Sequence, residues 1–134
     1  ADRQVNHPLA ESLPGLKMQV EQHMDNLQFS LALESIWQYV KTSNKYVEDS
    51  KPWSLAKDQT RRDELAAVIY NLAESLRIIS IFITPFMPET SDKIFQQLGI
   101  TETEHDLRLN TDWGLLKPGT ELKKGKPLFP RIEN

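Results

Sequence analysis

The chain has 134 residues, of which 39% are hydrophobic and 26% charged, and this size and composition are those of one globular domain. It has no cysteine, which excludes disulfides and thiolate metal sites and agrees with a reducing cytoplasm. The formal net charge of −3 argues against an indiscriminate nucleic-acid binder, which is usually strongly basic.

Targeting signals are also lacking in the sequence. The longest apolar run, residues 78–86, is interrupted by polar residues and is too short to span a bilayer, and the first residues have no apolar signal core. We therefore expect a cytoplasmic protein without a membrane partner.

Apolar residues at helical spacing predict four main helices. The first runs from Leu9 to about Asp25, and the second from Phe29 to a point before Pro52. A short turn or helix follows around residues 54–57. The third helix runs from about Arg61 to Ile83, a length of about 34 Å. The fourth begins at Pro88 and stops at Gly99.

Short connections between these helices predict an all-α antiparallel helical bundle over residues 1–99. From Ile100 onward, turn residues replace the helical spacing, so residues 100–134 are expected to form an irregular C-terminal tail that packs back on the bundle. From residue 111 this tail has five basic and three acidic residues.

The joint between the second and third main helices holds the most informative residues. Pro52 lacks an amide hydrogen and pushes Lys51 towards an extended conformation, which places Trp53 at the joint. A tryptophan at a joint is more often a plug that packs on the core, but a partly exposed indole can also stack on an unpaired base.

Asn44 lies in the stripe of the second helix that also contains Ile36 and Val40. A buried amide there needs a hydrogen-bond partner, because leaving it unsatisfied costs about 1–3 kcal/mol, and the alternative is an open surface. The surrounding residues 41–62 contain six basic and three acidic side chains. Five of the basic side chains are our candidates for phosphate contacts: Lys45, Lys51, Lys57, Arg61 and Arg62.

Catalytic patterns are missing or weak. There is no glycine-rich phosphate loop or nucleophile elbow. His23 is two residues from both Glu21 and Asp25, and residues two apart on a helix do not face the same way, so this spacing argues against a metal site there. Carboxylates such as Glu34, Glu74 and Glu89 are expected on solvated helix faces. On these grounds we predict that this chain has no catalytic residue and no metal site.

Several motifs together resemble one family. The stretches ALESIWQYVKTSNKYVEDSKPWSLAKD, LAAVIYNLAESLRIISIFITPFMPETSDKIFQQLG, WGLLKPG and KPLFPRIE are similar to the anticodon-binding region of bacterial methionyl-tRNA synthetases, which are class I aminoacyl-tRNA synthetases. The likeness covers nearly the whole chain and is closest to the form found in many Gram-positive and related bacteria.

The resemblance implies an all-helical domain that binds the CAU anticodon of methionine tRNA. Trp53 matches the family tryptophan that stacks on the anticodon, and Asn44 and Pro52 match its companions in the motif. A separate catalytic domain of the same parent chain attaches methionine with ATP and Mg²⁺; whether Zn²⁺ is also bound there stays open. No cofactor is implied for the present chain.

The resemblance also implies a fragment. The family's catalytic signatures and a preceding helix with an Asn…Arg pair have no match here, so we expect no activity from this chain alone. The segment from Leu115 to Ile132 is expected to fold towards the catalytic domain, with Leu128, Phe129 and Ile132 as an apolar patch.

Two alternatives remain at this point. The chain could be a helical protein-interaction bundle without an RNA role, in which Trp53 is buried and Trp53→Ala unfolds the protein. It could also be the equivalent domain of a sister class I synthetase, which would bind a different anticodon.

Overall fold

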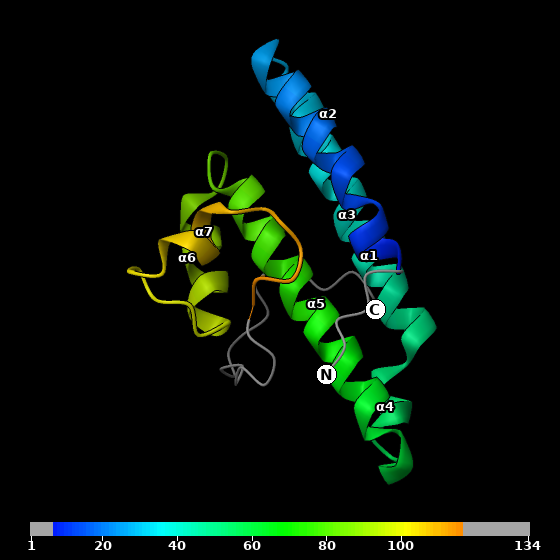
Figure 1. The fold of residues 1–134 in the computed structure, drawn as a ribbon. Coiled ribbons are helices and arrows are strands. Elements are labelled where there is room, and N and C mark those ends of the chain that lie inside the picture. The colour runs from blue at the N-terminus through cyan, green and yellow to red at the C-terminus, as the bar shows by residue number, and fades with distance from the viewer. Residues whose placement is uncertain (1–6, 117–134) are drawn as a thin grey trace.

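The computed structural model describes residues 7–116, and this part of the chain is helical without any strand (Figure 1). The elements in chain order are α1 (Pro8–Glu11), α2 (Leu13–Asp25), α3 (Phe29–Ser50), α4 (Pro52–Leu55), the 3₁₀-helix η1 (Gln59–Arg61), α5 (Arg62–Ile83), α6 (Pro88–Gln97) and α7 (His105–Leu109). The predicted all-α fold is confirmed.

Two helical pairs make up the bundle. α2 and α3 lie side by side as a long antiparallel hairpin, and α5 lies between α3 and α6 (Figure 1). The hairpin reverses at Leu27, which has a φ of 57°, while the Gln28 N–H donates to the oxygen of His23 at 2.7 Å. A left-handed residue followed by a hydrogen bond that reaches back five residues is the Schellman motif, which ends α2 here.

The core forms where α5 meets its neighbours. Its fully buried members include Ile36 from α3, Ile79 and Ile83 from α5, and Ile94 from α6. Residues 59–83 are long and apolar enough to cross a membrane by length and composition alone, but 56% of the apolar window is buried inside the fold. A helix that is apolar on nearly all sides is expected at the centre of a bundle.

The predicted end of the fourth helix is confirmed. Gly99 has a φ of 77°, and the Ile100 N–H reaches the oxygen of Phe95 at 2.9 Å. Glycine adopts this left-handed conformation at little cost, which is why it stops the helix.

Three details of the predicted elements are wrong. The first helix is broken at Ser12, where α1 ends and α2 begins. The buried face of α3 consists of Ala32, Ile36, Tyr39 and Ser43, whereas Val40 and Asn44, which share the predicted stripe with Ile36, are half-buried and exposed, respectively. The tail contains a helix, α7, which at five residues is too short to show helical periodicity.

Candidate nucleic-acid interface

The joint between α3 and α4 has no linker residue except Lys51. This residue caps α3 and precedes Pro52, and its φ of 50° and ψ of 62° are left-handed. The predicted extended conformation is therefore wrong. Proline disfavours only the right-handed helical region for the residue before it, and a left-handed residue ends α3 while turning the chain directly into α4.

Trp53 is the second residue of α4, and 55% of its surface is exposed. The side chain that anchors α4 is Leu55 instead, which is 4% exposed, and α4 packs against α5. The plug role considered for Trp53 is therefore wrong. An anchored single-turn helix presents the indole to solvent.

Asn44 is exposed on α3, about 9 Å along the axis before the last helical residue, Ser50. Of the two options for its amide, the open surface is the one observed. Pro52 is half-buried at the start of α4. Asn44, Pro52 and Trp53 thus belong to the end of α3 and the joint that follows it.

The basic residues near the joint differ in their ion pairs. Lys45 pairs with Asp49 at 3.3 Å, and Arg61 donates two hydrogen bonds to Glu64, at 3.0 and 2.7 Å. Lys51, Lys57 and Arg62 are exposed, and within residues 7–116 no ion pair forms at any of these three. Their charges are available to an incoming anion.

The turn between α4 and α5 is held by Asp58. Its carboxylate accepts hydrogen bonds from the Thr60 N–H at 3.0 Å and the Thr60 hydroxyl at 2.6 Å, capping η1. These bonds lower the pKa of Asp58 below its ordinary value, with a smaller contribution from the charge of Arg61. The Asp58 carboxylate is therefore ionised at neutral pH and can accept both hydrogen bonds that cap η1, between Lys57 and the start of α5 at Arg62.

Sequence reasoning missed one buried ion pair, formed by Glu74 and Arg77 on α5. Both side chains have zero exposure. Arg77 also donates at 2.6–2.9 Å to the main-chain oxygens of Leu107, Asn110 and Asp112. Glu74 in turn accepts hydrogen bonds of 2.7–3.3 Å from the main-chain N–H groups of residues 114–116.

The expectation that Glu74 lies on a solvated face is therefore wrong. Its interacting partners include residues about 40 positions later in the chain, which no local pattern shows. The available signal was a Glu and an Arg three residues apart within an apolar helix, because such residues are rarely buried unless they are paired.

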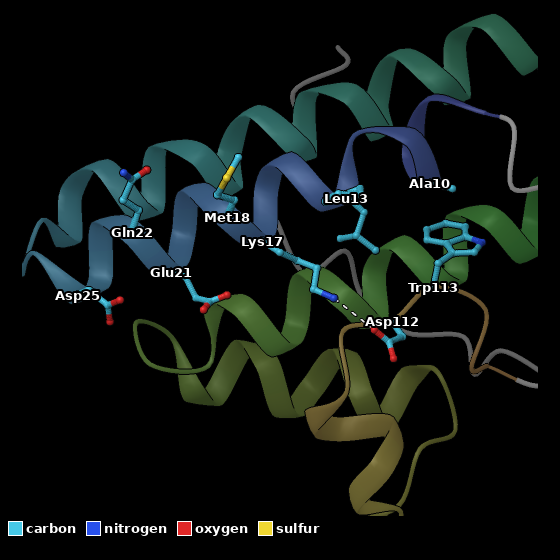
Figure 2. Close-up of a pocket in the computed structure, with 10 residues that line it drawn as sticks. Ala10, Leu13, Lys17, Met18, Glu21, Gln22, Asp25, Asp112 and Trp113 are labelled. Atoms are coloured by element: carbon cyan, nitrogen blue, oxygen red, sulfur yellow. Dashed lines mark hydrogen bonds and ion pairs between the residues drawn. The ribbon is translucent and has the colours of Figure 1, made fainter.

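A separate groove of about 690 Å³ lies between α2 and the turn that follows α7 (Figure 2). It is remote in the sequence from the joint and contains none of the predicted interface residues. In the described part of the chain, no group of three or more potential ligands is arranged to hold a metal ion.

Comparisons with known proteins identify the class of this domain. Residues 10–124 match the family described as the anticodon-binding domain of tRNA ligase. The chain belongs to this family.

Its relatives include methionine–tRNA ligases. The enzyme of Caldanaerobacter subterraneus subsp. tengcongensis is 49% identical over 138 residues, covering 99% of this chain and 21% of that protein. The Bacillus subtilis enzyme is 46% identical over 114 residues, covering 84% of this chain and 17% of that protein. The crystal structure of free Mycobacterium tuberculosis methionyl-tRNA synthetase matches with a TM-score of 0.79 and 32% identity, over 94% of this chain and 25% of that one. The chain thus spans about a fifth of the curated relatives' length.

Proposed function

We propose that this chain is the anticodon-recognition part of a methionine–tRNA ligase and that it binds the CAU anticodon loop of methionine tRNA. The observation that carries the proposal is the 55% exposure of Trp53 on a helix held in place by Leu55. A rigid, solvent-facing indole is suited to stack on a base that is splayed out of a loop.

The other residues near the joint support the same role. The Asn44 amide, exposed on α3, can hydrogen-bond a base edge, and Pro52 sets the direction of α4. Lys51, Lys57 and Arg62 supply uncompensated charge for phosphates, while Lys45 and Arg61 contribute less because carboxylates already pair with them.

Discrimination between anticodons follows from differential binding. The correct bases stack and hydrogen-bond, whereas a wrong base leaves polar groups unpaired, at a cost of about 1–3 kcal/mol each. In the longer enzyme, this binding selects the tRNA to which the catalytic part attaches methionine with ATP and Mg²⁺. We place that enzyme in the cytoplasm and expect no ligase activity from this chain alone.

The test is a titration of a fluorescently labelled methionine tRNA anticodon stem-loop with the chain at low salt, followed by anisotropy. A second stem-loop carries a changed first anticodon base. Trp53→Ala is expected to weaken binding of the matching loop by about fivefold to 150-fold, the equivalent of one stacked base. Circular dichroism of this variant should match the unaltered chain, because the indole is largely exposed.

Phe29→Ala is the matched control, because Phe29 is an aromatic residue of similar exposure at the opposite end of α3, about 30 Å from the joint. The affinity of the Phe29→Ala variant for the matching stem-loop should equal that of the unaltered chain. If neither the chain nor a longer enzyme containing it prefers the matching loop, the proposal is wrong. An unfolded Trp53→Ala variant would favour the interaction-bundle alternative, and a preference for another anticodon would favour a sister synthetase.

A further inference from the structure

The end of α3 and the joint that follows it are held to the rest of the fold by few contacts. Ser43 and Leu55 are buried, but no residue between them is. This stretch, residues 44–54, carries all three of the proposed recognition residues. Its position therefore depends on the half-buried side chains that reach neighbouring helices.

Tyr46 is the half-buried side chain that makes a polar contact with another helix. Its hydroxyl accepts a hydrogen bond of 2.8 Å from the side-chain amide of Asn71 on α5. Asn71 is 1% exposed, so water cannot replace Tyr46 as its partner without an opening of the fold. Within residues 7–116, no other side chain of the stretch 44–54 hydrogen-bonds to a different helix. This bond therefore ties the last two turns of α3 to α5.

The Tyr46 ring also packs on a part of the fold that is itself fixed. The centroid of the Tyr46 ring lies 5.8 Å from that of His7, which is 6% exposed just before α1. The His7 ring meets Trp113 edge to face, with the centroids 5.0 Å apart. The main chain directly after Trp113, residues 114–116, is bonded to the buried carboxylate of Glu74.

Two anchors on α5 thus flank the joint. Tyr46 precedes Lys51, and Leu55, in the helix α4 that packs against α5, follows it (Figure 1). With both sides tied to the same helix, the Asn44 amide and the Trp53 indole keep a fixed relation to each other before any ligand arrives. A site that is already rigid loses less conformational freedom when it binds.

We propose that Tyr46 is a positioning residue for anticodon recognition, which acts through Asn71 to hold Asn44 and Trp53 in the arrangement that receives the RNA. The inference rests on the proposed function, because it assigns Tyr46 a role at the same site. This role differs from that of Trp53, since the Tyr46 hydroxyl and ring meet Asn71 and His7, whereas the indole of Trp53 meets solvent.

Tyr46→Phe tests the role, because it removes the hydroxyl and keeps the ring that packs on His7. Its affinity for the matching stem-loop should fall by about twofold to tenfold, the equivalent of one hydrogen bond. In an Asn71→Leu background, where the bond is already absent, Tyr46→Phe should cost little further affinity. The titration uses this chain, or the full-length enzyme if only that protein binds the loop.

The control separates positioning from a general loss of stability. Ile94 is a fully buried residue of α6, and Ile94→Val or Ile94→Ala is chosen to lose the same stability as Tyr46→Phe in urea denaturation. At a temperature where both variants are folded, the Ile94 variant should bind the matching stem-loop as tightly as the unaltered protein.

Hydrogen exchange without RNA measures the tie itself. In Tyr46→Phe, the amides of residues 44–57 should exchange faster than in the unaltered chain. The increase should exceed that in the stability-matched Ile94 variant, because the lost bond lets this stretch open locally.

Unchanged stem-loop affinity in Tyr46→Phe would overturn the positioning role. So would an equal loss of affinity in the Ile94 variant, or exchange in residues 44–57 that is no faster than in that variant. These results leave the proposed function standing, because the unaltered protein still prefers the matching loop. If neither the chain nor the full-length enzyme prefers that loop, the proposed function fails and the positioning role falls with it.

Discussion

Arg77 lies one turn after Glu74 on α5, and its guanidinium donates two hydrogen bonds of 2.8 Å to the Glu74 carboxylate while both side chains are fully buried. The pair also holds the main chain of residues 107–116 through both its donors and its acceptors. It is therefore the main polar connection between α5 and the C-terminal part of the described chain.

Removing Arg77 should destabilise the protein strongly. Arg77→Met leaves the Glu74 carboxylate buried without its cation, and the free energy of unfolding should fall by about 3–5 kcal/mol in urea denaturation. Arg61→Met, which breaks an exposed ion pair, should change little. The double replacement Glu74→Leu/Arg77→Met should not restore stability, because it leaves the main-chain groups of residues 107–116 unpaired. Full recovery in the double variant would contradict this account.

Tyr46 should matter for stability through Asn71. The Asn71 side chain is 1% exposed, and its amide nitrogen donates to the Tyr46 hydroxyl at 2.8 Å. Tyr46→Phe removes this acceptor and should lower the free energy of unfolding by about 1–3 kcal/mol. In a double-mutant cycle, Tyr46→Phe should cost much less in an Asn71→Leu background. An equal cost in both backgrounds would show that the hydrogen bond is not the cause.

The burial of Tyr39 should make the folded protein less stable at alkaline pH. Burial, with a smaller contribution from the charge of Glu74, raises the pKa of Tyr39 well above its usual value, and its hydroxyl donates to the oxygen of Leu9 at 2.8 Å. The folded state therefore favours the protonated phenol. The stability that the Tyr39 phenol contributes is fully present below about pH 10, its pKa in the unfolded chain. This stability is lost as pH rises from there towards the higher pKa of Tyr39 in the folded state.

Denaturation midpoints measured on both sides of about pH 10 test this prediction. Tyr39→Phe should be less stable at neutral pH, by about 0.5–1.5 kcal/mol for the lost hydrogen bond, but should show a shallower alkaline decline than the unaltered chain. Parallel declines in the two proteins would mean that Tyr39 titrates normally.

Neighbouring arginines should differ in their effect on RNA binding. Arg62 is exposed and has no ion pair in the described part of the chain, whereas Arg61 is held by Glu64. If Arg62 contacts a phosphate, Arg62→Ala should reduce the slope of log K against log salt by about 0.7 for a single-stranded loop. Arg61→Ala should change the slope less. The measurement is the stem-loop titration at several salt concentrations, and a larger effect at Arg61 would reverse the assignment.

The main helices could be predicted because their causes are local. Apolar spacing placed α3 and α5, Pro88 marked the start of α6, and Gly99 marked its end. The break at Ser12 was hidden because the apolar spacing continues across it. α7 contains too few residues to show a period.

The errors at the candidate interface have a different cause. Whether Trp53 packs inward or faces solvent depends on which residue of α4 meets α5, and Leu55 occupies that contact. Glu74 was misplaced for a similar reason, since its main-chain partners lie 40–42 residues away. Patterns within one helix cannot show either relationship. The predicted apolar patch of Leu128, Phe129 and Ile132 lies outside the described residues, and the division of the chain at residue 99 stays a proposal.

The left-handed Lys51 has a consequence for the direction of the indole. With no other residue between α3 and α4, one φ,ψ pair sets the angle at which Trp53 leaves the hairpin axis. A β-branched residue there would resist the positive φ and turn α4 away, whereas glycine would relieve the strain and let α4 swing. The proposed stacking of Trp53 on a base would therefore depend on the backbone torsion of Lys51 as much as on the indole ring.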